Sequence, residues 1–133
     1  MADPAEHQHL LQAALAARNN AHAPYSEFLV GAALEDFDGR IHTGCNVENA
    51  SYGLTVCAER VAVAKAVSEG ARSFRRLAVA ADTFPLTRPC GACRQVLSEF
   101  CEDLEILLVN PSGQTDSVRL KDLLPRAFHG SLL

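Results

Sequence analysis

Three cysteines in two short segments restrict the fold of this chain more than any other feature of its sequence. Cys57 belongs to the segment Cys57–Glu59, and Cys90 and Cys93 belong to the segment Pro89–Cys93. Cys57 stands at the predicted start of one helix, and the other two cysteines lie in the first turn of a second predicted helix. Free N–H groups and the positive end of the helix dipole favour a thiolate over a thiol at such places. If both helix starts point into one space, the fold gathers three thiolates around one metal ion.

A carboxylate close to the first cysteine favours a catalytic metal site over a structural one. Three protein ligands on a tetrahedral zinc leave the fourth position open for water, whereas a structural site closes that position. Glu59 follows Cys57 by two residues and is well placed to move protons to and from that water. These residues therefore indicate a zinc hydrolase.

Two other interpretations of the cysteines remain open at this point. The spacing of Cys90 and Cys93 alone also fits a thioredoxin-like redox pair or half of a structural zinc site. A redox pair leaves Cys57 and Glu59 unexplained, and a structural site needs a fourth ligand. The remaining histidines are interpreted as surface or satisfied core residues: His22, His42 and His129. Cys45 and Cys101 are interpreted as small, buried apolar residues.

Composition and charge limit the class of protein. With 133 residues, 48% of them hydrophobic, the chain is expected to form a single domain over residues 1–133 with a buried core. The net charge of −4 and the lack of a basic block argue against binding to a nucleic acid polymer. We interpret the only basic cluster as a solvated loop: Arg72, Arg75 and Arg76.

The sequence also carries expectations about location. It does not open with a basic stretch and an apolar core, so we expect no secretory signal. No apolar run approaches the roughly 20 residues of a membrane span, and no membrane association is expected. Five cysteines, an odd number, argue for reduced thiols. The protein is therefore expected in the cytoplasm.

The order of apolar periodicities predicts an α/β fold without internal repeats. A helical pattern over residues 4–18 precedes a β-hairpin, whose strands are expected at 28–34 and 41–47 on either side of an Asp-Gly turn. Helices and strands then follow in this order: helix 57–67, strand 77–81, helix 90–100, strand 105–109, strand 117–120 and a short helix 121–124.

The two cysteine segments resemble those of a known enzyme family. Cys57-Ala58-Glu59-Arg60, followed by Pro89-Cys90-Gly91-Ala92-Cys93-Arg94-Gln95, is similar to the short, homotetrameric, zinc-dependent cytidine deaminases. Three further blocks resemble the same family in the same order: 24–33, 44–52 and 123–128. The resemblance implies a three-layer α/β/α sandwich around a mixed five-stranded sheet, and a homotetramer with sites shared between subunits.

The resemblance also implies roles at the metal. Cys57, Cys90 and Cys93 are expected to bind one zinc ion per subunit, and Glu59 is the expected catalytic proton carrier. Arg60 is expected to offset the negative charge of the thiolates. The alternatives are that Glu59 only stabilises the helix dipole and that Arg60 is a solvated helix residue.

Substrate contacts are expected from the earlier blocks. Asn46 and Glu48 match the family's pair for the ribose hydroxyls, although on their own they also fit turn and surface residues. Phe28 matches the aromatic residue that packs on the pyrimidine, and Ala58 is another expected substrate contact. Two aromatic residues are expected to reach a neighbouring subunit's pocket: Tyr52 and Phe128.

Deamination of cytidine and deoxycytidine to uridine and deoxyuridine, in pyrimidine salvage, is the function that this resemblance implies. Three alternatives stay open: a deaminase of a related aminopyrimidine nucleoside such as a nucleoside antibiotic, a polynucleotide-editing or nucleic-acid-binding zinc module, and a silent zinc protein. The acidic charge argues against the second, and an intact Glu59 argues against the third.

Overall fold

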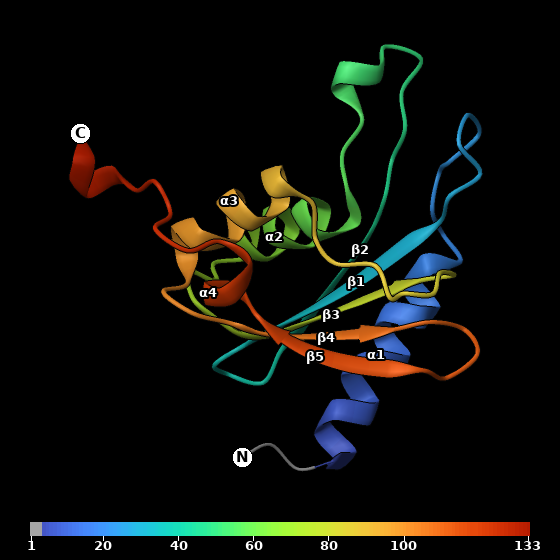
Figure 1. Ribbon diagram of the computed structural model, residues 1–133, viewed down its shortest axis with the longest axis horizontal. Coiled ribbons are helices and arrows are strands. Elements are labelled where there is room, and N and C mark those ends of the chain that lie inside the picture. The colour runs from blue at the N-terminus through green and yellow to red at the C-terminus, as the bar shows by residue number, and fades with distance from the viewer. Residues whose placement is uncertain (1–3) are drawn as a thin grey trace.

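One mixed five-stranded sheet forms the centre of the computed structural model, which describes residues 4–133. The strand order is β2-β1-β3-β4-β5 (Figure 1). β3 and β4 run parallel, and the other neighbouring pairs are antiparallel. The strands are β1 (Val30–Asp36), β2 (Ile41–Cys45), β3 (Phe74–Ala81), β4 (Glu105–Val109) and β5 (Thr115–Arg119).

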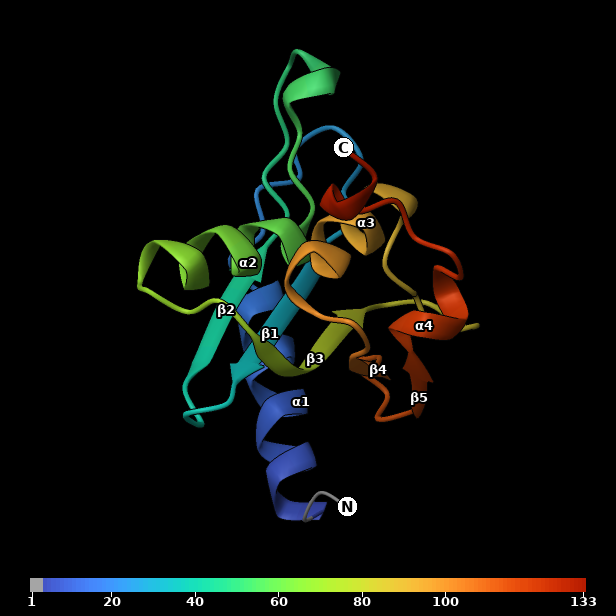
Figure 2. The same cartoon turned by 90° about the vertical axis from the view of Figure 1, so that its left-hand side faces the viewer.

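Helices cover both faces of this sheet. The first helix packs on one face, and the second and third pack on the other, which gives three layers (Figure 2). This α/β/α sandwich confirms the expected fold class. Over residues 4–133, no helix has the length and apolar character needed to cross a membrane. The helices are α1 (Pro4–Arg18), α2 (Ala58–Ser68), α3 (Gly91–Phe100), α4 (Leu120–Leu123) and the 3-10 turns η1 (Tyr52–Leu54) and η2 (Gly130–Leu132).

Alternation along the strands gives the sheet two apolar faces. Ala78 and Ala80 of β3 pack with Leu10 of α1 in one core. Leu77 and Val79 of the same strand belong to the other core, which lies under α2 and α3. Because successive strand residues point to opposite faces, β3 is buried on both sides and forms the middle of the molecule.

Gly44 fixes the distance between β2 and the start of α2. A Cβ at this position would lie 2.5 Å from the carbonyl oxygen of Ala58 and 2.6 Å from the amide nitrogen of Ala62. Both atoms belong to the α2 backbone, which cannot move away without displacing Cys57 and Glu59. The missing side chain therefore allows the first turn of α2 to lie against the sheet.

Replacing Gly44 with alanine should destabilise the protein by about 2 kcal/mol, because the added methyl group overpacks a backbone contact. Urea unfolding measures the change in the free energy of unfolding. Gly53→Ala is the matched control, since nothing lies within 4 Å of a Cβ built there. A Gly44→Ala variant as stable as the control would contradict the close approach of α2 to β2.

The hairpin forms around its predicted turn, but both strands are shorter than predicted at the end nearest α2. β1 begins at Val30 and β2 ends at Cys45, each two residues inside the predicted limit. Beyond this end, the side chain of Asn46 forms hydrogen bonds with the backbone of the neighbouring segment. Its Oδ1 accepts a hydrogen bond from the Val30 amide at 2.9 Å, and its Nδ2 donates to the Phe28 carbonyl at 2.7 Å. Phe28 therefore lies on a loop and not within the sheet.

The interpretation of Arg76 as part of a solvated loop is wrong. β3 begins at Phe74, three residues before the predicted start at Leu77, and Arg76 lies inside it with 4% of its surface exposed. Its guanidinium contacts Glu35 at 2.6 Å and Glu105 at 3.3 Å. Because neighbouring strands supply both carboxylates, the buried charge is compensated by partners distant in sequence.

The other elements lie close to their predicted positions. The first helix and the fourth strand have the predicted limits, and α2 is shifted by one residue. β5 and α4 begin earlier than predicted, at Thr115 and Leu120, because β5 pairs with the full length of β4.

Candidate active site

The three candidate ligands meet between the starts of α2 and α3. Cys57 is the N-cap residue of α2, Cys90 is that of α3, and Cys93 lies in the first turn of α3. The sulfur of Cys90 lies 3.8 Å from that of Cys57 and 3.4 Å from that of Cys93, and all three sulfurs lie within 4.8 Å of one another. Zinc–sulfur bonds of about 2.3 Å in a tetrahedron set sulfur atoms about 3.8 Å apart. The trio therefore fits a zinc ion.

This cluster holds three protein ligands and leaves one side open. In the part of the chain that the structure describes, no further His, Cys, Asp or Glu ligand atom joins the group. Cys57 and Cys90 line a cavity of about 340 Å³, whereas Cys93 is buried behind them. A tetrahedral site with a free position toward a cavity has the form of a catalytic zinc site.

Hydrogen bonds within the trio favour deprotonation of its first member. The hydrogen bond with Cys93 is the largest cause that lowers the pKa of Cys57 to about 5, and contacts with Arg60 and Cys90 add to it. The pKa of Cys93 is raised by its hydrogen bond to Cys57 and by burial. One thiolate is therefore available near neutral pH, and a bound dication displaces the remaining protons.

Arg60, which the family resemblance places near the thiolates, lies beside the sulfur of Cys57. It follows Cys57 by three residues, so the two side chains share one face of the helix start. Its Nη2 donates a hydrogen bond to the Cys57 sulfur at 3.7 Å, and this contact raises the pKa of the guanidinium. Among the described residues the Nε of Arg60 is buried without a hydrogen-bond partner. The guanidinium is therefore held at the cluster by the hydrogen bond from Nη2 and by its charge.

Glu59 is buried in the first turn of α2 and lines the same cavity as Cys57 and Cys90. Only 4% of its surface is exposed. Burial raises the pKa of Glu59 to about 7, and the negative charge of Cys57 adds to this effect. A carboxyl group with a pKa near 7 can both accept and donate a proton at neutral pH.

Asn46, Phe28 and Ala58 meet at the cavity from three different segments. Asn46 is 8% exposed, and its amide group bonds to the backbone of Phe28 and of Val30, where the loop joins β1. Phe28 keeps 40% of its surface exposed, which is unusual for a phenylalanine beside a core. Ala58 is fully buried and also lines the cavity. The structure therefore brings these three predicted substrate contacts together.

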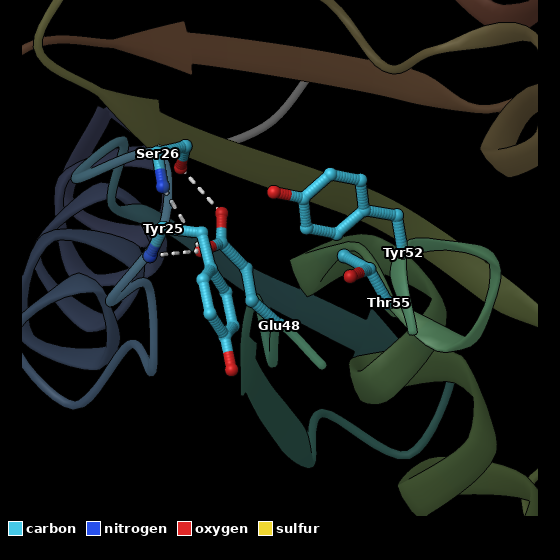
Figure 3. Close-up of a pocket in the computed structure, with 5 residues that line it drawn as sticks. All are labelled: Tyr25, Ser26, Glu48, Tyr52 and Thr55. Carbon is cyan, nitrogen blue, oxygen red and sulfur yellow. Dashed lines mark hydrogen bonds between the residues drawn. The ribbon is translucent and has the colours of Figure 1, made fainter. Parts of the chain in front are cut away.

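Glu48 lies on the loop after β2 and lines both this cavity and the adjoining space that Figure 3 shows. Its Oε1 accepts hydrogen bonds from the amides of Tyr25 at 3.0 Å and Ser26 at 3.2 Å, and its Oε2 accepts one from the Ser26 hydroxyl. The pKa of Glu48 is lowered, mainly by the hydrogen bond from the Ser26 side chain. The carboxylate is therefore ionised and held in place at the cavity edge.

Tyr52 and Phe128 do not reach the cavity of Glu59 within this chain. Tyr52 lines a second, adjoining space of about 420 Å³ (Figure 3). Its ring meets that of Tyr25 edge to face, with centroids 6.0 Å apart, and 74% of the residue is exposed. Phe128 is 56% exposed, and its carbonyl accepts a hydrogen bond from Gln95. Both aromatic rings are thus free to contact another molecule.

Three hydroxyl-bearing residues of the cavity wall received no role from the sequence: Ser26, Thr55 and Thr87. Thr55 and Thr87 carry no pattern that distinguishes them from loop residues. Ser26 stands two residues before Phe28 in the loop that resembles the deaminase family, and that position is the only signal that could have identified it.

Comparisons with known proteins agree with this geometry. Residues 4–107 match the family described as the cytidine and deoxycytidylate deaminase zinc-binding region. The chain is 53% identical to a cytidine deaminase of Sporosarcina psychrophila, over 84% of this chain and 83% of that protein. It is 50% identical to one of Halalkalibacterium halodurans, over 92% and 94% of the two chains. The crystal structure of cytidine deaminase from Burkholderia pseudomallei superposes with a TM-score of 0.88 at 50% identity, covering 92% of this chain and 98% of that chain.

Proposed function

The chain belongs to the cytidine and deoxycytidylate deaminase family, and from this membership we propose that it hydrolyses cytidine and deoxycytidine to uridine and deoxyuridine with release of ammonia. The observation that carries the proposal is the position of the buried Glu59 carboxyl group, which lines the same cavity as two thiols of an open three-cysteine cluster. We propose that the reaction serves the salvage of pyrimidine nucleosides.

Cys57, Cys90 and Cys93 hold one zinc ion per subunit in this proposal. When bound, zinc lowers the pKa of a water molecule toward about 7 and so provides a nucleophile near neutral pH. Three thiolates carry more negative charge than one dication neutralises. Arg60 offsets this excess through its contact with the Cys57 sulfur.

Glu59 is the proton carrier. Its carboxylate takes one proton from the attacking water and delivers it to N3 of the pyrimidine, while the water oxygen forms a bond to C4. Glu59 then passes the second proton of the water to the 4-amino group. The C4–N4 bond breaks, ammonia leaves, and C4 keeps the oxygen as the carbonyl group of uridine.

The earlier segments select the nucleoside. Phe28 contacts the face or edge of the pyrimidine ring, and Ala58 closes the floor beneath it. Glu48 accepts a hydrogen bond from a sugar hydroxyl, and the second N–H of the Asn46 amide donates to the sugar. A substrate without the hydroxyl leaves these groups unpaired and is bound more weakly.

A spectrophotometric assay tests the function directly. Purified protein should decrease the absorbance of cytidine and of deoxycytidine and release one ammonia for each uridine or deoxyuridine formed. Absence of turnover with both nucleosides, in protein that contains zinc, would overturn the proposal.

The exposed aromatic residues support a homotetramer in which subunits share their sites. Tyr52 is 74% exposed and Phe128 is 56% exposed, so both aromatic side chains are available for contacts with another subunit. We expect activity and the tetramer to disappear together on dilution, as measured by light scattering and assay of the same samples. A fully active monomer would exclude the shared site.

A further inference from the structure

The carboxylate of Glu48 is held entirely by one short segment of the loop between α1 and β1. Two backbone amides, from Tyr25 and Ser26, donate to one oxygen, and the Ser26 hydroxyl donates to the other (Figure 3). An ionised carboxylate offers about four lone-pair sites. Three of them are occupied by these contacts, so one remains for a sugar hydroxyl. Ser26 and Glu48 both line the cavity that contains Glu59.

Ser26 also contacts the residue proposed to hold the pyrimidine. The amide of Phe28 donates to the Ser26 oxygen at 3.0 Å. Glu27, between them, has a φ of 60°, a left-handed conformation that is uncommon for a residue with a side chain. Since a hydroxyl has a single proton, the bond from Phe28 leaves that proton for Glu48. The serine thus connects the sugar contact with the ring contact.

We propose that Ser26 is a positioning residue for the deamination proposed above: by fixing the Glu48 carboxylate, it sets the preference of the site for nucleosides with a secondary sugar hydroxyl. A glutamate side chain loses rotamer freedom when it is ordered, and this loss opposes binding. The two backbone amides fix Oε1 of Glu48 and the Ser26 hydroxyl fixes Oε2 before the substrate arrives, so less of this loss falls on binding. The hydrogen bond from the Ser26 side chain is the main cause that lowers the pKa of Glu48, so the group stays an ionised carboxylate that accepts hydrogen bonds.

A comparison of two substrates isolates this role. Deoxycytidine and 2′,3′-dideoxycytidine differ only in one secondary hydroxyl, so the ratio of their kcat/KM values cancels effects on ring contact, zinc and general folding. Ser26→Ala should lower this ratio about tenfold, mainly through KM, as expected for one lost hydrogen bond to a charged group. Ser26→Thr retains the hydroxyl and should keep the ratio within about twofold of wild type.

Double substitution shows whether the serine acts through Glu48. In a Glu48→Ala background, Ser26→Ala should change the ratio by less than about twofold, because the positioned group is gone. Ser112→Ala, an exposed serine in the β4–β5 turn, is the matched control and should leave the ratio unchanged. If Ser26→Ala does not fold, Ser26→Cys, a weak donor, takes its place with the same expected loss.

The two proposals fail in different ways. An unchanged ratio in Ser26→Ala, or an equal tenfold loss in the Glu48→Ala background, would overturn the role of Ser26 while wild-type turnover of deoxycytidine remains intact. If zinc-loaded wild type converts neither cytidine nor deoxycytidine, the deaminase proposal itself is wrong.

Discussion

Replacing Glu59 with glutamine should lower kcat for cytidine by about 10³-fold, with zinc content and fold retained. A single positioned acid–base group contributes about 10²–10⁴-fold, and Glu59 is proposed to serve both proton transfers. Glutamine has nearly the same shape but cannot take or give a proton at neutral pH. Steady-state kinetics, together with zinc analysis of the same preparation, measure the effect.

Thermal stability separates a catalytic loss from a folding defect. Burial raises the pKa of Glu59 to about 7, above its value in the unfolded chain. As the pH rises between these two pKa values, the unfolded chain releases a proton that the folded protein keeps, so the folded state loses stability. This penalty is absent below the ordinary pKa of glutamate and complete above pH 7. In zinc-free protein, Glu59→Gln removes this penalty and should be at least as stable as wild type at pH 8.

Glu99→Gln is the matched control for this substitution, since Glu99 is an exposed glutamate on α3. Its activity and stability should equal those of wild type. A Glu59→Gln enzyme that keeps more than a tenth of the wild-type rate would contradict the proposed proton transfers.

The sequence predicts the metal centre well because its geometry is local. Each cysteine segment lies at a helix start, and a helix start has the same geometry wherever it occurs. Cys57, Glu59 and Arg60 share one turn of α2, so their mutual placement follows from their spacing. What the spacing does not contain is the position of α2 on the sheet, which depends on contacts such as that of Gly44 with the α2 backbone.

Contacts between loops are the part that local patterns miss. Ser26 and Glu48 are 22 residues apart, and neither lies in a helix or strand whose period could align them. Arg76 presents the same difficulty on a strand, because its buried position depends on Glu35 and Glu105 from neighbouring strands. In both cases a polar residue is stabilised by a partner that only the folded chain supplies.

Removing zinc should abolish deamination and reduce thermal stability, and stoichiometric zinc should restore both. The three sulfurs come from two helices, so the ion joins α2 to α3 in addition to its chemical role. A ligand present at a thousand times its Kd adds about 4 kcal/mol to the stability of the state that binds it. Chelator titration, followed by activity assay and calorimetry, measures both losses.

Cys90→Ala tests the ligand set with little disturbance of packing, because Cys90 is exposed whereas Cys93 is fully buried. Its zinc content should fall from one ion per chain to well below stoichiometry, since one of three protein bonds to the metal is lost. Cys45→Ala is the matched control, because Cys45 is a free thiol of β2 that does not belong to the cluster. It should keep full zinc and activity. A Cys90→Ala protein that retains one zinc ion and normal turnover would exclude Cys90 as a ligand, and with it the open tetrahedral site on which the mechanism depends.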